Sequence, residues 1–185
     1  GNLMKVYVHL ATGFEEIEAV TIIDVLRRAE IDVESVSVTG SDTVVGAHGV
    51  SVKADVLFED ADYENCEMIV LPGGIPGTPN LESHEGLAEE IKKFANEGRK
   101  LAAICAAPMI LGELGLLEGK TAVIYPGMES HLKGATIGSR SVEIDGSFIT
   151  SKGPGTAMDF ALALVGILKD EMTVKTLKGA MLLND

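Results

Sequence analysis

The sequence has few aromatic residues and few cysteines, and each scarcity excludes a class of protein. Aromatic residues make up 4% of the chain, with no tryptophan, whereas hydrophobic residues make up 46%. The core must therefore be aliphatic, which is typical of buried parallel strands rich in Val and Ile. Two cysteines, Cys66 and Cys105, in 185 residues do not make a disulfide scaffold. We expect a soluble cytoplasmic protein with reduced thiols.

Basic residues are also scarce. The chain has 15 Lys and Arg against 28 Asp and Glu, a net charge of −13. This balance argues against binding to nucleic acid or to an anionic membrane, because phosphate contacts need clustered Lys and Arg. No apolar run approaches the length of a membrane span, and MKVYVHLATG lacks the features of a signal peptide. We interpret residues 1–3, which precede Met4, as a remnant added to the chain, and residues 4–185 as one domain.

Several sequence motifs of cofactor and metal sites are missing. GxGxxG and Walker patterns are absent, so we predict no nucleotide cofactor. CxxC and HExxH spacings are absent, so we predict no metal site. A Cys-His protease needs an imidazole beside its thiol, but Ala106 follows Cys105. His9 and His131 remain open as partners through the fold, although a surface or packed position is the ordinary alternative.

Strand and helix patterns alternate along the chain. We expect strands at 4–10, 33–39, 67–74, 101–105 and 121–125, hairpins at 43–56 and 141–151, and helices at 15–29, 82–97, 107–117, 156–168 and 171–182. The alternation predicts a three-layer α/β sandwich with a mainly parallel sheet. Ligands bind beyond the carboxyl ends of such strands. Four loops should meet there: ATGFEE, PGGIPG, CAAP and YPG.

The stretch LAAICAAP, residues 101–108, is the centre of the predicted site. A short apolar run that ends at Cys105 and continues into small residues and a helix indicates a sharp strand-to-helix turn. Such a turn exposes one side chain at the positive end of the next helix, which favours a thiolate. The alternative is an inert core cysteine.

Three glutamates near the start of the first helix compete as partners of that sulfur. We favour Glu18 over Glu15 and Glu16, because it begins a polar stripe at three- and four-residue spacing on an otherwise apolar helix. The stripe comprises Glu18, Thr21, Asp24 and Arg28. It indicates a site or a subunit contact, or else an ordinary solvated face. A carboxyl desolvated in a crevice has a raised pKa and can donate a proton to a thiolate.

Two glycines, Gly73 and Gly74, follow the 67–74 strand. Their backbone N–H groups, with the amide that follows the cysteine, would suit an oxyanion. The alternative is a plain tight turn. Loop convergence also brings Tyr125 within reach of this group.

The stretches GFEEIEAV, IDVLRRA, VLPGG, AAICAAP and TSKGPGTAMDFAL resemble the ThiJ/PfpI superfamily, in the branch of the Parkinson-disease-associated protein deglycase. They span nearly the whole chain in the expected order. The resemblance implies a flavodoxin-like α/β fold and a homodimer with Arg28 near its interface. It implies that Cys105 is the nucleophile, that Glu18 is the protonated carboxyl beside it, and that the amides of Gly73, Gly74 and Ala106 line an oxyanion pocket.

Three positions restrict what the resemblance implies. Tyr125 stands before Pro126 where the well-known member has a histidine, which removes a candidate proton shuttle. His48 stands where that branch has an arginine, which weakens any anion pocket there. Ala106 excludes the Cys-His pair of the protease-like branch, so we do not expect peptidase activity.

The resemblance leaves two functional hypotheses. The first is a deglycase or glyoxalase-like enzyme without a cofactor, which acts on methylglyoxal, glyoxal or their early adducts. The second is a redox-sensing or chaperone-like stress protein that works through oxidation of Cys105. Both hypotheses assume a thiol of low pKa.

Overall fold

A seven-stranded sheet forms the centre of the chain, in a computed structural model that describes residues 4–183. The predicted remnant at residues 1–3 and the last two residues of the predicted domain lie outside the described residues. The strand order is β10-β11-β7-β6-β1-β2-β5, and every neighbouring pair is parallel except β10 and β11. The strands are β1 (Lys5–Leu10), β2 (Val33–Ser37), β5 (Val56–Leu57), β6 (Cys66–Leu71), β7 (Lys100–Ile104), β10 (Val142–Asp145) and β11 (Phe148–Ser151).

The central strands supply apolar side chains to both faces of the sheet. In β1, Val6 and Val8 join one core while Tyr7 joins the other. In β6, Val70 and Leu71 divide in the same way. Side chains alternate across a strand, so a strand buried on both faces reads as a continuous apolar run. The central strands can therefore be predicted from continuous runs of aliphatic residues, although the sequence has few aromatic residues.

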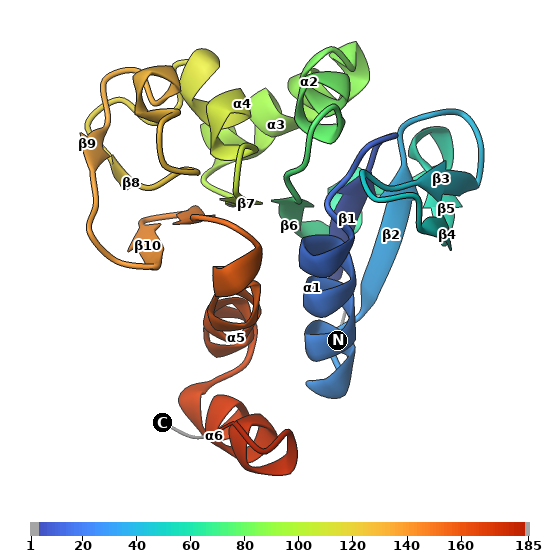
Figure 1. Cartoon of the computed structure of the whole chain (residues 1–185), viewed down its shortest axis with the longest axis vertical. Helices are drawn as coiled ribbons and strands as arrows, with labels where there is room; N and C mark the ends of the chain where they lie inside the picture. Colours follow the sequence, from blue (N-terminus) through green and yellow to red (C-terminus); the bar gives the residue numbers. More distant parts are fainter. Residues whose placement is uncertain (1–3, 184–185) are drawn as a thin grey trace.

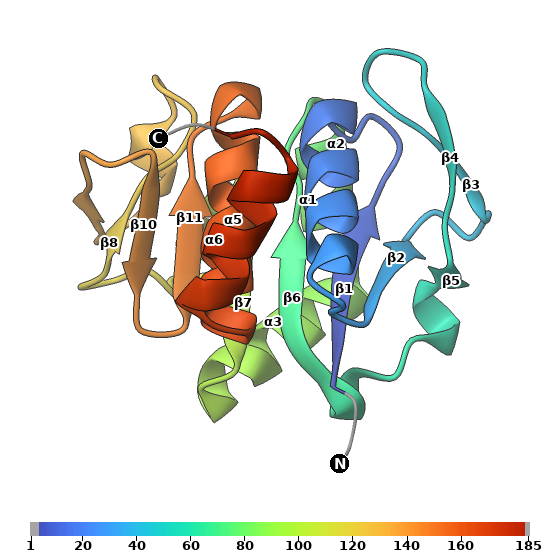
Figure 2. The same ribbon diagram turned by 90° about the horizontal axis from the view of Figure 1, so that it is seen from below.

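Helices cover both faces of the sheet, as Figure 1 shows. One face carries α1 (Glu16–Arg28), α5 (Ala157–Leu168) and α6 (Glu171–Ala180), and the other carries α2 (Gly77–Glu82), α3 (Glu85–Glu97) and α4 (Pro108–Glu113). Figure 2 shows α1 and α5 side by side in front of the strands, with α3 behind. This is the predicted flavodoxin-like three-layer sandwich.

Some elements differ from the sequence predictions. The expected strand at 121–125 is reduced to β8 (Thr121–Ala122), which pairs with β9 (Thr136–Ile137) outside the main sheet. The next residue, Val123, donates its N–H to Thr150 Oγ1 instead of a ladder carbonyl. The helix expected at 107–117 ends at Glu113, and Gly115 then adopts a φ of 77°. The six-residue helix α2 was not predicted.

The hairpin expected at 43–56 is formed by β3 (Thr43–Val45) and β4 (Ser51–Lys53). Its tip lies beside the start of α1: the N–H of Ala47 donates to the carbonyl of Phe14. Within residues 4–183, no helix combines the length and the apolar character that a membrane crossing requires.

Candidate active site

Cys105 occupies a strained turn between β7 and α4. Its φ is 66°, in the left-handed region that a residue with a side chain rarely adopts. Two backbone hydrogen bonds fix this turn. The N–H of Cys105 donates to the Ser151 carbonyl at 3.0 Å, and the carbonyl of Cys105 accepts the Tyr125 N–H at 2.9 Å. The predicted strand-to-helix turn is therefore present, and the neighbouring strand and loop maintain its geometry.

Glu18 lies fully buried in the first turns of α1, against the thiol of Cys105. Its Oε1 accepts the N–H of Gly73 at 2.9 Å. Its Oε2 is buried and has no hydrogen-bond partner within the described part of the chain, so one oxygen of the carboxyl remains available to exchange a proton. Of the three competing glutamates, Glu18 is the one whose carboxyl interacts directly with the thiol.

Gly73 makes this contact possible. A Cβ on Gly73 would lie 2.5 Å from the Cβ of Cys105 and 3.0 Å from Oε1 of Glu18, and the first distance is far inside van der Waals contact. The prediction that the Gly73 amide lines an oxyanion pocket is corrected, because this amide is already bonded to Glu18. The amides of Gly74 and Ala106 are the ones that face the sulfur of Cys105.

Both acidic groups have raised pKa values, and burial is the main cause in each case. Burial raises the pKa of Glu18 to about 7. Burial and the adjacent Glu18 carboxylate raise the pKa of the Cys105 thiol to about 12. The expectation of a low-pKa thiol is wrong for the state in which Glu18 is ionised, because desolvation and like charge outweigh the two amides and a helix of six residues. In this state Glu18 is placed to act as a base toward the thiol.

A cavity of about 540 Å³ opens beside the sulfur. Its apolar lining is formed by Ile75, Tyr125, Pro126, Met128 and Pro154, and Glu15 also lines it. The side chains of Ile75 and Tyr125 are exposed at the rim, by 63% and 48%. Tyr125 is thus brought to the site as predicted. Ile75 and Pro154 were not singled out, although they stand in the glycine-rich stretches PGGIPG and KGPGT.

The two histidines left open by the sequence lie elsewhere. His9 is buried with its Nε2 2.6 Å from the Tyr63 hydroxyl, and burial lowers its pKa to about 4. His131 pairs with Glu113 at 2.8 Å. Among the described residues, no imidazole lines the cavity beside Cys105.

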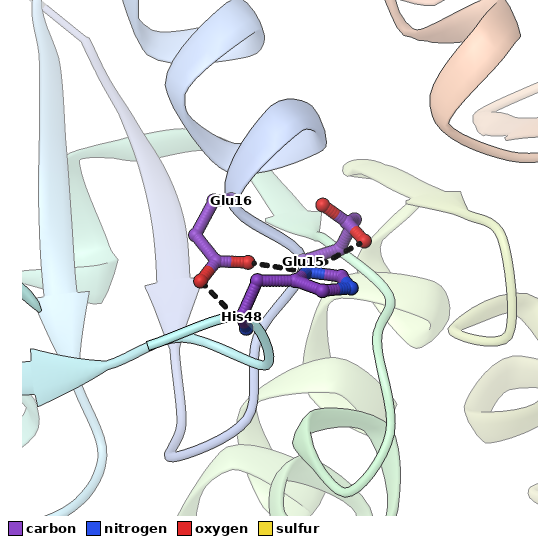
Figure 3. Close-up of side chains that lie close together, drawn as sticks. All are labelled: Glu15, Glu16 and His48. Carbon is purple, nitrogen blue, oxygen red and sulfur yellow. Dashed lines mark hydrogen bonds and ion pairs between the residues drawn. The ribbon is translucent and has the colours of Figure 1, made fainter. Parts of the chain in front are cut away.

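His48 instead binds two glutamates at the start of α1 (Figure 3). Glu16 accepts the backbone N–H groups of His48 and Val50 at 2.7 and 3.1 Å, and its Oε1 lies 3.0 Å from His48 Nδ1. Glu15 caps the helix through the Ile17 N–H at 2.9 Å, and its Oε1 lies 3.6 Å from the same imidazole nitrogen. These contacts raise the pKa of His48, the Glu16 hydrogen bond most of all.

The same three side chains place ligand atoms within 4.8 Å of one another, a spacing that a metal ion could bridge. The oxygens of Glu16 already accept three hydrogen bonds from the hairpin, which accounts for their position without an ion. We therefore assign no metal to this cluster.

Arg28 lies on the exposed face of α1, where its Nε is 2.5 Å from Asp24 Oδ1. It does not line the cavity beside Cys105. A larger hollow of about 600 Å³ borders this face and is lined by Val20, Arg28 and Val52 among others. It contains neither cysteine, so we place the candidate active site at the smaller cavity.

The sequence profile of the DJ-1/PfpI family matches residues 4–167, most of the chain. The chain belongs to the DJ-1/PfpI family. Two relatives in this family are the Arabidopsis thaliana DJ-1 homologs B and A, which are 45% and 42% identical to the chain over 163 residues. These matches cover 87% and 86% of the chain but 37% and 42% of the relatives, so the chain spans less than half the length of either one.

Solved DJ-1/PfpI structures share the whole fold. The structure of oxidised Toxoplasma gondii DJ-1 superposes with a TM-score of 0.92 at 37% identity and covers 97% of this chain and 98% of its own. A Pyrococcus abyssi relative that is named a deglycase is 29% identical over 168 residues, which are 90% of this chain and all of the relative.

Proposed function

We propose that the chain is a cysteine-dependent deglycase or glyoxalase-like enzyme that needs no cofactor. Its substrates are small reactive carbonyls, such as methylglyoxal and glyoxal, or their early adducts. The observation that carries the proposal is the buried contact between the Cys105 thiol and the Glu18 carboxyl at the wall of an open cavity. The family includes a relative named a deglycase, which supports the same class of reaction.

The first step is addition of the Cys105 sulfur to the aldehyde carbon. Glu18 takes the thiol proton, since its pKa of about 7 leaves much of it ionised at neutral pH. A carbon–sulfur bond forms, the carbonyl double bond opens, and the oxygen becomes the hydroxyl of a hemithioacetal by accepting that proton. The amides of Gly74 and Ala106, which face the sulfur, stabilise negative charge that develops on this oxygen.

The second step is an internal rearrangement. Glu18 removes the proton from the hemithioacetal carbon and returns it to the neighbouring carbonyl carbon through an enediol, which leaves a thioester of a 2-hydroxy acid. No external oxidant or reductant takes part, because one carbon is oxidised as its neighbour is reduced. Water then hydrolyses the thioester, releases lactate from methylglyoxal or glycolate from glyoxal, and restores the thiol. With an early adduct, the sulfur bonds to the carbon that carries the amine, the carbon–nitrogen bond breaks, and the leaving amine accepts the thiol proton from Glu18 to give the same hemithioacetal.

The test is the formation of lactate by the purified protein after addition of methylglyoxal. We expect turnover by the native chain and by Cys66→Ala, whose thiol lies in β6 away from the cavity. We expect none by Cys105→Ser. Absence of Cys105-dependent lactate, together with no removal of adducts from a glycated peptide, would contradict the enzyme hypothesis.

A redox-sensing role is the second candidate. Two amides and a carboxyl surround the sulfur of Cys105, an arrangement suited to holding a sulfinate, and the Toxoplasma relative is described as oxidised. This role predicts that peroxide adds two oxygens to Cys105 in intact-mass spectra while methylglyoxal yields no lactate. Turnover therefore separates the two candidates.

We also propose that the protein acts as a homodimer through the exposed face of α1. Ile17 and Val20 on this helix are 57% and 48% exposed, and Val45 and Val50 of the adjoining hairpin are 44% and 51% exposed. Neighbouring apolar side chains of this size are typical of a surface that a partner covers. Arg28 lies on the same helix and lines one hollow together with Val20.

A further inference from the structure

The cavity beside Cys105 has a mostly apolar lining with one charged group. The apolar side chains are those of Ile75, Tyr125, Pro126, Met128 and Pro154. Among the described residues, none of those that line the cavity carries a positive charge, and Glu15 is the one carboxylate. A substrate with a carboxylate would therefore lie beside a negative charge, and no lining side chain would offset that charge.

The size of the cavity exceeds the needs of a three-carbon dicarbonyl. Its volume of about 540 Å³ lies within the range of about 300–1,000 Å³ that is usual for drug-sized ligands. The exposed side chains of Ile75 and Tyr125 at the rim offer apolar surface to a substituent that extends outward from the reacting carbon. Burial of an aromatic ring against such a wall is favourable.

The Glu15 carboxyl is fixed in place at the cavity. The residue is 8% exposed, and its Oε2 accepts the Ile17 N–H at the amino end of α1 at 2.9 Å. The charge of Glu15 also contributes to the raised pKa of Glu18, so it acts across the site. The nearest imidazole, His48, makes its shorter contact with Glu16 and leaves Glu15 less compensated.

We propose that the cavity selects uncharged α-oxoaldehydes that carry an apolar substituent of about phenyl size, and that Glu15 rejects those that carry a carboxylate. The inference rests on the proposed function and specifies its substrate class. The reaction balances as before: an arylglyoxal and water give the corresponding 2-hydroxy acid. Because that product is an anion, the carboxylate that rejects anionic substrates also favours release of the product.

The experiment compares phenylglyoxal with 4-carboxyphenylglyoxal, which have the same reacting group and ring and differ by one carboxylate. Methylglyoxal is the third substrate. The kcat/KM of each is measured by chromatography of its 2-hydroxy acid product, which is mandelate, 4-carboxymandelate or lactate. We expect phenylglyoxal to exceed methylglyoxal, and to exceed its carboxylate analogue by about tenfold or more, the factor that corresponds to 1.4 kcal/mol of charge repulsion.

Two matched pairs of variants identify the residues responsible. Glu15→Gln should reduce the discrimination between the two arylglyoxals at least about threefold, as expected when one nearby charge is removed. Glu64→Gln makes the same charge change just before β6, at the opposite end of that strand from Gly73, and should leave the discrimination unchanged. Ile75→Ser should lower the preference for phenylglyoxal over methylglyoxal, whereas Ile137→Ser, on β9 outside the cavity, should not.

If Glu15→Gln fails to fold, ionic strength supplies the same test. Discrimination against the carboxylate by the native chain should shrink as salt rises, because the Debye length falls from about 30 Å at 0.01 M to 3 Å at 1 M. Equal kcat/KM for the two arylglyoxals would overturn the inference, as would discrimination in Glu15→Gln that is as large as in the native chain. Absence of turnover with all three substrates would instead overturn the proposed function.

Discussion

Gly73 lies between the side chains of Cys105 and Glu18, and a Cβ at this position would be 2.5 Å from the Cβ of Cys105. Its N–H also donates to the Glu18 carboxyl at 2.9 Å. One glycine therefore determines both how close the two acidic groups lie and which oxygen of Glu18 remains free for the thiol. The chemistry proposed for the site depends on this contact.

Gly73→Ala should disrupt the site more than the fold. The added methyl group must displace Cys105 or Glu18, at a cost of about 1–3 kcal/mol for overpacking. We expect alkylation of Cys105 by iodoacetamide and turnover of methylglyoxal to change by at least about tenfold, since small displacements of reacting groups are costly. Gly155→Ala is the control, because a Cβ there meets no atom within 4 Å. Equal behaviour of the two variants would contradict the role given to Gly73.

Glu18 should make the stability of the protein depend on pH. Burial raises its folded-state pKa from 4.5 to about 7, so the folded state binds the proton more tightly than the unfolded state. This contribution to stability is fully present below pH 4.5 and is lost as pH rises to about 7, by about 3 kcal/mol. Glu18→Gln should remove that loss.

The measurement is urea denaturation of the native chain and of Glu18→Gln at pH 4 and pH 8. The variant should gain stability relative to the native chain at pH 8, while the difference at pH 4 is small. Glu64→Gln, an exposed carboxylate before β6, controls for the change in net charge. A parallel pH dependence in native chain and Glu18→Gln would show that Glu18 titrates normally.

The sequence was informative about the sharp turn at Cys105 and less so about its surroundings. An apolar run followed by Cys105, small residues and Pro108 predicts a strand-to-helix turn from local preferences alone. The positive φ of Cys105 depends on hydrogen bonds with the Ser151 carbonyl and the Tyr125 N–H, which are 46 and 20 residues away along the chain. Local sequence does not contain such contacts.

Glu18 illustrates a similar limit. It was favoured over Glu15 and Glu16 because it shares a helical stripe with Asp24 and Arg28. In the structure Glu18 is fully buried while Asp24 and Arg28 are exposed, so the stripe is not one continuous face of a site. Periodicity placed the three residues on one side of α1, but the depth of each depends on how the helix packs against the sheet and the glycine loop.

The short elements were the least predictable. Residues 121–125 have the β-branched composition of a strand, yet β8 has only two residues. The N–H of Thr121 donates to the Asp145 carboxyl, and the N–H of Val123 donates to the Thr150 hydroxyl. These hydrogen bonds replace pairing with the main sheet. The helix α2 is only six residues long, with Pro79 inside it, so its periodicity is too brief to detect.

Val20→Glu should dissociate the proposed dimer. Val20 is 48% exposed on α1 and borders the hollow that also touches Arg28, so a buried carboxylate there would lack a partner. Sedimentation at micromolar concentration should find the native chain dimeric and Val20→Glu monomeric. Met172→Glu, at a 71% exposed position on α6, should remain dimeric. A native chain that sediments as a monomer would contradict the proposed interface.

Glu16→Gln should weaken the hairpin that carries His48. Burial alone would raise the pKa of Glu16. Hydrogen bonds from the backbone N–H groups of Glu16, Val50 and His48, and from the His48 imidazole, outweigh burial and lower this pKa to about 2. The stability that this carboxylate contributes is therefore present above pH 4.5 and is lost as pH falls toward 2. We expect Glu16→Gln to lower the free energy of unfolding by about 1–3 kcal/mol at pH 7, the scale of hydrogen bonds to a charged group, and by less at pH 3.

The comparison with His48→Ala separates the two kinds of contact that hold this hairpin. His48→Ala keeps the backbone N–H groups at positions 48 and 50 and removes only an imidazole that is 71% exposed. Its cost should stay below about 1 kcal/mol, as for other exposed ion pairs. Urea denaturation of both variants at pH 7 and pH 3 measures the difference. A loss for His48→Ala equal to that for Glu16→Gln would mean that the imidazole, and not the backbone, anchors the hairpin to the start of α1.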